Sequence, residues 1–253
     1  MRKNSIKKIV YGDVFCIGDH VIACGDARDT EFVNRVIGKR KITMVCVDPP
    51  YGVSLVEAKA GFAKLKMPKV ILNDDIASEP EYARFTKEWL IPIIPHLEKK
   101  NSFYVFNSDK MLFALRDGMR QAGVRFSQLL IWIKNHAVVG RKDYLPAHEL
   151  IAFGWHGTHK FRKSKDKTLF YYPKPNKSPY HPSTKPVGLI RRLVLNSSDI
   201  GDVVYDCFLG SGTTMLACEQ AKRVCIGIER DPDYILTAIQ RVEAAMNFTA
   251  QKI

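Results

Sequence analysis

Four consecutive residues, Asp48, Pro49, Pro50 and Tyr51, combine an acid, two rigid prolines and an aromatic ring directly after the apolar run 42–47. Proline fixes φ and has no N–H, so carbonyl groups beside it stand without a competing donor. An amino group can donate to the Asp48 carboxylate and the Pro49 carbonyl, which pulls its nitrogen toward tetrahedral geometry and frees the lone pair. Tyr51 is suited to stack on an extruded base. The alternative is a plain Pro-Pro turn ending a strand, which an Asp-Pro pair alone would favour.

A second group of residues predicts a strand, a glycine turn and a helix over 203–214. Glycine lets the backbone approach a ligand closely, and the N-terminus of a helix offers free N–H groups. Glu229, nineteen residues after Gly210, ends the next predicted strand and can accept both hydroxyls of a ribose. The unit therefore indicates a nucleoside cofactor, although a lone G-x-G is also common in ordinary turns. The candidate binding residues in the turn are Asp206, Phe208, Gly210, Ser211, Gly212 and Thr213.

Two other nucleotide-binding motifs fit this turn poorly. No Gly-Lys-Ser/Thr follows, as a phosphate-binding P-loop requires. The third glycine of a dinucleotide fingerprint is missing, and Leu216 stands near its place.

These candidate residues need elements that bring them together. Apolar runs of strand length occur at 21–24, 42–47, 103–106, 203–205 and 224–228, and helical patterns at 79–97, 109–122, 186–196, 213–222 and 231–247. Short, nearly continuous apolar strands alternating with helices predict a doubly wound α/β fold with a mostly parallel sheet. The carboxyl ends of such strands lie at one edge, where ligands bind, and the acidic and glycine-rich positions follow the predicted strands.

Composition narrows the class of protein further. The 253 residues carry a formal net charge of +13, which favours a polyanionic partner, nucleic acid before an anionic membrane surface. A generally basic surface is the alternative. No run approaches the roughly 20 apolar residues of a membrane span, and the six cysteines form no C-x-x-C pair. We therefore expect a single domain over 1–253 that is cytoplasmic, makes no membrane contact and keeps its cysteines as free thiols.

Two basic segments interrupt the alternation of strands and helices, at about 52–74 and 134–180. Between Lys134 and Lys177 there are ten Lys/Arg against three Asp/Glu, interleaved with aromatic residues. Phosphate contacts and base stacking explain this composition, with a solvated charged surface as the alternative. The DNA-binding candidates are Lys134, Arg141, Lys142, Lys160, Arg162 and Lys163. The histidines nearby lack the regular spacing of a metal site, so no metal is expected.

The tetrad and the glycine turn together resemble the DNA amino-methyltransferases, the adenine-N6 and cytosine-N4 family. The tetrad precedes the turn, an order similar to the permuted β group of that family, whereas RNA and protein amino-methyltransferases mostly carry the cofactor motif first. Further segments resemble family elements over nearly the whole chain. They are Gly25 to Arg28, Asn101 to Asp109, Leu130 to Lys134, His148 to Ile151, His181 to Pro186, and Gly227 to Asp231 with Tyr234.

The resemblance implies a seven-stranded, mostly parallel sheet with one antiparallel strand, and S-adenosylmethionine as cofactor. Asp26 is implied to lie near the cofactor's adenine, and the segment containing Lys185 to hold its methionine end. Two positions depart from the family pattern: Cys207 replaces a usual proline, and Ser183-Thr184 replaces a usual Thr-Gln. These changes leave individual cofactor contacts open.

The implied activity is direct methyl transfer to adenine N6 in a short site of double-stranded DNA, with the target base flipped out. A tetrad that begins with Asp favours adenine, because cytosine-N4 enzymes of the family more often begin with Ser. Cytosine-N4 methylation, an RNA or protein amino-methyltransferase, and a non-enzymatic nucleic-acid-binding module are the alternatives. Dimerisation is common in the group, so a homodimer is also considered.

Overall fold

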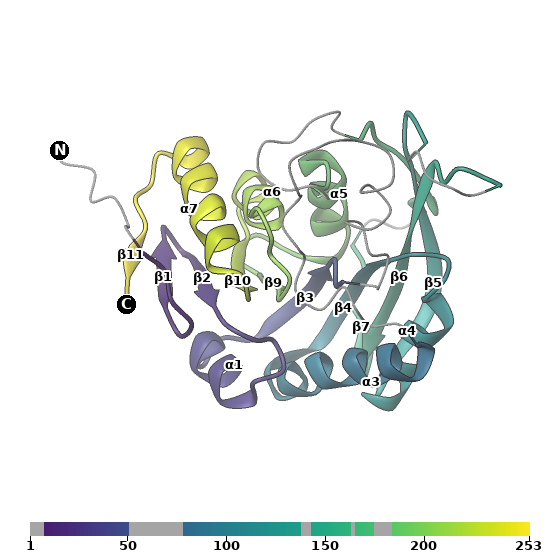
Figure 1. Cartoon of the computed structure of the whole chain (residues 1–253), viewed down its shortest axis with the longest axis horizontal. Coiled ribbons are helices and arrows are strands. Elements are labelled where there is room, and N and C mark those ends of the chain that lie inside the picture. The colour runs from purple at the N-terminus through teal and green to yellow at the C-terminus, as the bar shows by residue number, and fades with distance from the viewer. Residues whose placement is uncertain (1–7, 51–77, 138–142, 163–164, 175–183) are drawn as a thin grey trace.

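The computed structural model describes residues 8–50, 78–137, 143–162, 165–174 and 184–253. One mixed sheet runs through the molecule in the order β11-β1-β2-β10-β9-β3-β4-β6-β5-β8, with β7 paired to β4 (Figure 1). Its strands are β1 (Val14–Ile17), β2 (His20–Cys24), β3 (Ile42–Val47), β4 (Leu97–Asn107), β5 (Val124–Ile133), β6 (His148–His156), β7 (Thr158–His159), β8 (Leu169–Tyr171), β9 (Val203–Asp206), β10 (Val224–Glu229) and β11 (Gln251–Lys252).

Seven adjacent strands of this sheet match the expected arrangement. From β2 through β10, β9 and β3 to β4 every pairing is parallel, and β6 lies antiparallel between β4 and β5. The α/β class is therefore confirmed, but the strand count was too low. Three further strands extend the sheet, β1 and β11 beyond β2 and β8 beyond β5, and β7 pairs with the start of β4. Of these four strands, β7, β8 and β11 have only two or three residues.

Helices cover both faces of the sheet (Figure 1). They are α1 (Thr30–Ile37), α3 (Glu79–Leu90), α4 (Leu112–Gln121), α5 (Val187–Ser197), α6 (Thr213–Ala221) and α7 (Pro232–Met246). Successive strand side chains point to opposite faces, and in β3 Val45 packs with α1, α3 and α4 while Met44 packs with α5, α6 and α7. Two apolar cores thus enclose the parallel strands, as their continuous hydrophobicity predicts.

The expected helix 79–97 is shorter than predicted. Ser78 caps its start, with its hydroxyl accepting from the Glu81 N–H and the Glu81 carboxylate accepting from the Ser78 N–H. The α-helix ends at Leu90 and a 3₁₀ helix, η1 (Ile91–His96), follows. Pro92 and Pro95 supply no N–H to an α-helical ladder, which explains the change. No helix among the described residues is long and apolar enough to cross a membrane.

The parallel strands bring the candidate residues to one edge of the sheet. Asp48 directly follows β3, Asp206 ends β9 and Glu229 ends β10, and these three strands belong to one parallel set in which β9 lies between the other two. Gly25 follows β2, and its N–H donates to the Glu229 carbonyl at 2.9 Å. The predicted convergence of the acidic and glycine-rich positions is therefore present in the fold.

Candidate active site

The glycine turn between β9 and α6 is shaped by positions where a side chain would not fit. Gly210 and Gly212 have φ of 51° and 79°, in the left-handed region that glycine adopts without strain. A Cβ on Gly212 would also stand 3.3 Å from Ala238 and 3.2 Å from Val242 on α7. The helix α6 begins at Thr213, so its first N–H groups face the turn. The missing Cβ of Gly212 therefore makes room for α7, and the N–H groups at the start of α6 are what the turn offers to a ligand.

Hydrogen bonds to Glu229 connect this turn to the end of β10. Its two carboxylate oxygens accept the Gly210 N–H and the Asp231 N–H, each at 2.9 Å. A carboxylate has about four acceptor sites, so Glu229 keeps acceptor capacity for a further donor such as a ribose hydroxyl. Burial raises the pKa of the Glu229 carboxyl above its usual range. Glu229 therefore ends β10, as the sequence predicts, and holds the loop, while its contact with a ribose stays a prediction.

The carboxylate of Asp206 accepts hydrogen bonds from other residues of the turn. The Thr214 hydroxyl donates to Asp206 Oδ2 at 2.5 Å, and the Phe208 N–H donates to Oδ1 at 3.1 Å. The residue is only 4% exposed, and burial raises the pKa of the Asp206 carboxyl to about 7. These two hydrogen bonds shape the loop, while a direct cofactor contact by Asp206 stays a prediction.

The remaining predicted residues of the turn are held by neighbours from other helices. Arg241 on α7 donates to the Ser211 carbonyl at 3.0 Å, the Ser211 hydroxyl at 2.9 Å and the Thr213 hydroxyl at 3.0 Å. The Phe208 ring packs edge-on against Trp89 of α3, with centroids 5.6 Å apart. Arg241 was not predicted from the sequence, because it lies 28 residues beyond Thr213 and its helical pattern carries no signal that links it to the turn.

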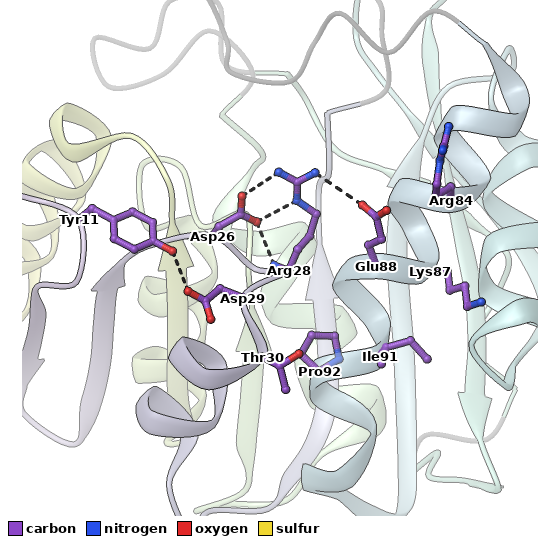
Figure 2. A pocket seen from close by; sticks show the side chains of 10 residues that line it. All are labelled: Tyr11, Asp26, Arg28, Asp29, Thr30, Arg84, Lys87, Glu88, Ile91 and Pro92. Carbon is purple, nitrogen blue, oxygen red and sulfur yellow. Dashed lines mark hydrogen bonds and ion pairs between the residues drawn. The ribbon is translucent and has the colours of Figure 1, made fainter.

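Asp26 follows β2 and borders a pocket of about 670 Å³ (Figure 2). It accepts from Arg28 Nη2 at 2.8 Å, and Arg28 Nη1 also lies 3.6 Å from Glu88 of α3. Burial acts against ionisation, but the hydrogen bonds from Arg28 hold the pKa of Asp26 below its usual range. The pocket is lined by Tyr11, Asp26, Arg28, Asp29, Thr30, Arg84, Lys87, Glu88, Ile91 and Pro92.

Asp48 belongs to a buried row of alternating charges. Lys185 forms an ion pair with Asp48 Oδ2 and lies 3.2 Å from Glu149, and Lys134 lies 2.8 Å from Glu149. The side chains of Lys185 and Lys134 are 7% and 3% exposed. Asp48 Oδ1 is buried and finds no hydrogen-bond partner among the residues that the structure describes. A buried acceptor without a donor is costly, so this oxygen suits an incoming N–H group.

The charges in this row shift one another's ionisation. Burial raises the pKa of the Asp48 carboxyl, with the neighbouring carboxylate of Glu149 adding to the rise and Lys185 opposing it. Burial also disfavours the charge of Glu149, yet Lys185 and Lys134 hold its pKa below the usual range. Two carboxylates and two ammonium groups make the row neutral when all four are ionised.

The structure separates the predicted DNA-binding residues into different surroundings. Lys134 is buried in the row described above. Lys160 Nζ lies 2.5 Å from Asp202 and 3.1 Å from Asp199, and Arg162 also pairs with Asp199. Tyr51, Arg141, Lys142 and Lys163 lie outside the described residues. DNA contact by any of the six residues therefore stays a prediction, and the basic tract is more internally paired than its sequence indicated.

The site and fold define the class of enzyme, and comparison with known proteins agrees. The model of the DNA methylase family, which joins the N6 and N4 amino-methyltransferases, matches residues 42–240, and the chain belongs to this family. S-adenosylmethionine is the cofactor of the family. The turn fits that group, because the N-terminus of α6 offers N–H groups and the Glu229 carboxylate lies beside it as an acceptor.

Two type II methyltransferases are similar along most of the chain. M.HpaI of Haemophilus parainfluenzae is 25% identical over 235 residues, which cover 83% of this chain and 70% of that protein. M1.MboII of Moraxella bovis is 22% identical over 250 residues, covering 81% of this chain and 90% of that protein.

Solved structures share the fold. The M1.HpyAVI–SAM complex superposes with a TM-score of 0.63 at 23% identity, covering 87% of this chain and 98% of that one. The cytosine-N4-specific PvuII DNA methyltransferase superposes with a TM-score of 0.67 at 18% identity, covering 93% and 89%. A putative DNA modification methylase of Thermus thermophilus, complexed with S-adenosylmethionine, gives a TM-score of 0.62 at 18% identity, covering 89% and 94%.

Proposed function

We propose that this DNA methylase transfers a methyl group from S-adenosylmethionine to adenine N6 within a short recognition sequence. The observation that carries the proposal is Asp48 Oδ1, which has no partner among the described residues and lies at the carboxyl end of β3, beside the glycine turn. A tetrad that begins with Asp favours adenine over cytosine. Cytosine N4 is the alternative, because the chain shares its fold with a cytosine-N4-specific enzyme.

Each residue of the tetrad has a defined task in this proposal. Asp48 Oδ1 and the Pro49 carbonyl accept the two N–H bonds of the exocyclic amino group, which localises the nitrogen lone pair. Tyr51 stacks on the base after it leaves the duplex, which limits the reaction to a flipped nucleotide. Bound S-adenosylmethionine supplies the electrophilic methyl group. Transfer goes directly to nitrogen: the methyl–sulfur bond breaks as the methyl–nitrogen bond forms, S-adenosylhomocysteine is the leaving group, and the amino nitrogen releases one proton to solvent. None of the cysteines is therefore required as a nucleophile.

The cofactor contacts follow from the same arrangement. The carboxylate of Glu229 is proposed to accept the ribose hydroxyls, and Gly210 and Gly212 to admit the cofactor against the backbone. Asp26 is proposed to lie by the adenine end, where it borders the pocket of Figure 2. Lys185 pairs with Asp48 and Glu149, so any contact it makes with the methionine end uses the third donor of its ammonium group.

The test is transfer of a tritiated methyl group from S-adenosylmethionine to unmethylated genomic DNA, followed by mass spectrometry of the nucleosides. N6-methyladenine supports the proposal, and N4-methylcytosine corrects the base while keeping the mechanism. The variant Asp48→Asn keeps the side-chain shape but loses the charge, and we expect kcat to fall by about 10²–10³-fold. Its cofactor affinity, measured by calorimetry, should stay within a few-fold; equal loss of both would remove Asp48 from its proposed role.

A further inference from the structure

The buried row of charges extends beyond the residues that the proposed reaction uses. Asp48 and Lys185 come from the end of β3 and the segment before α5, whereas Glu149 lies on β6 and Lys134 directly after β5. The antiparallel pairing of β5 with β6 places Trp132 opposite Glu149, so the sheet itself fixes this part of the row. Burying an ion pair costs free energy of desolvation unless each charged group also has enough hydrogen-bonding or charged partners.

Two aromatic rings restrict where the lysines can lie. Lys185 Nζ is 5.2 Å from the centroid of the Phe106 ring, and Lys134 Nζ is 5.2 Å from the centroid of the Trp132 ring. A cation over an aromatic face is attracted to it, more strongly when it is shielded from water. Each ammonium group is therefore held between a ring and a carboxylate, and Lys185 is shared between Asp48 and Glu149.

We propose that Glu149 and Lys134 are positioning residues of this methylase, which hold Lys185 on Asp48 Oδ2 so that Oδ1 stays available to the target amino group. The inference rests on the proposed role of Asp48. Without the charge of Glu149, nothing would hold Lys185 on the Oδ2 side of Asp48, and its ammonium group would be free to pair with Oδ1 as well. Without Lys134, the unpaired charge of Glu149 would draw Lys185 away from Asp48. The two substitutions therefore act on Asp48 in opposite directions.

The ionisation of Asp48 supplies a readout that a purely structural role would not move. The titratable groups around the Asp48 carboxylate come from several elements. They are Lys185, Glu149 and Lys134 in the row, Tyr82 on α3, Asp206 on β9 and Cys46 on β3. Glu149 raises the pKa of Asp48, whereas Lys134 lowers it. Glu149→Gln should thus shift the acid limb of the rate to lower pH, and Lys134→Met should shift it to higher pH, each by about one unit.

The experiment measures the single-turnover rate of methyl transfer to DNA against pH for the wild type, Glu149→Gln and Lys134→Met. We expect opposite shifts of the acid limb, a rate at the optimum that is about ten- to a hundredfold lower, and unchanged cofactor affinity. Lys134→Arg keeps the charge and should keep the wild-type profile. Lys39→Met, an exposed site after α1, is the matched control for loss of a lysine.

Two results would overturn the inference. One is a wild-type pH profile in both Glu149→Gln and Lys134→Met, which would mean that the row of charges contributes only to packing. The other is a Lys134→Met variant with an unchanged profile and only a raised KM for DNA, which would make Lys134 a phosphate contact. Thermal unfolding of each variant separates these results from misfolding, and Lys134→Arg supplies a second, milder test. The proposed role of Asp48 is tested separately, because full activity of the variant Asp48→Asn would contradict that role whatever the result for Glu149 and Lys134.

Discussion

The carboxylate of Glu229 combines a structural and a binding task. It accepts the N–H groups of Gly210 and Asp231, and so defines the loop against which the cofactor is proposed to lie. Glu229→Ala should therefore weaken binding of S-adenosylmethionine by about 1–3 kcal/mol, the scale of hydrogen bonds lost at a buried polar site. Isothermal titration calorimetry measures this change directly. Glu31→Ala, an exposed acid on α1, is the control, and an unchanged affinity in Glu229→Ala would place the ribose elsewhere.

Asp206 gives the protein a stability that depends on pH. Burial raises its pKa to about 7 in the folded state, above the value of about 4 in an unfolded chain. A raised pKa means that the folded state binds the proton more tightly. The stabilisation is therefore present at low pH and is lost as the pH rises through 7.

We expect the free energy of unfolding of the wild type to fall by roughly 2–3 kcal/mol between pH 5 and pH 8, relative to the variant Asp206→Asn. Urea denaturation of both proteins without cofactor, at the two pH values, measures the difference. Asparagine does not titrate, so other ionisable groups cancel in the comparison. A difference that is constant with pH would show that Asp206 is ionised in the fold despite its burial.

At the scale of elements, helices α3 and α4 pack unusually closely at Gly118. A Cβ there would stand 2.5 Å from the carbonyl oxygen of Ala83 and 2.5 Å from Cβ of Thr86, so a helix would have to move. In an exposed helix, replacing Gly by Ala stabilises by about 1 kcal/mol. Here we expect Gly118→Ala to destabilise by about 1–3 kcal/mol.

Urea denaturation checks this sign, with Arg120→Ala on the exposed side of α4 as the control that should change stability by less than about 0.5 kcal/mol. Stabilisation by Gly118→Ala would mean that the two helices have room to separate.

The elements that sequence could predict are those with a continuous local signal. β3 and β10 are long apolar runs, and their observed bounds, Ile42–Val47 and Val224–Glu229, differ from the predicted ones by at most one residue. β8 and β11 could not be predicted, because two or three residues carry no period and exist only through pairing with β5 and β1. The end of α3 was missed where two prolines convert an α-helix to a 3₁₀ helix.

The candidate site follows the same division. The tetrad and the glycine turn were found because contiguous residues carry both motifs. The pairing of Lys185 with Asp48, 137 positions apart, and the support of Ser211 by Arg241 were not, because no local pattern links residues that meet only in three dimensions. Lys134 shows a different difficulty. It was predicted to contact DNA because it lies in a basic stretch of sequence, but the fold buries its side chain.

At the scale of the whole molecule, the net charge of +13 governs association with DNA, and only unpaired cations release counterions when they bind phosphate. Lys160 is already neutralised by Asp199 and Asp202. We therefore expect Lys160→Ala to change the salt dependence of DNA binding little.

The double variant Arg141→Ala/Lys142→Ala removes two charges that the sequence predicts to contact phosphate. We expect it to weaken binding to all sequences about equally, and to reduce the slope of log K against log salt by roughly two. Fluorescence anisotropy with a short duplex between about 50 mM and 200 mM salt measures both quantities. A larger loss of slope in Lys160→Ala than in the double variant would mean that DNA displaces Asp199 and Asp202, so that the paired face of the molecule, and not the segment between β5 and β6, is the one that lies on the duplex.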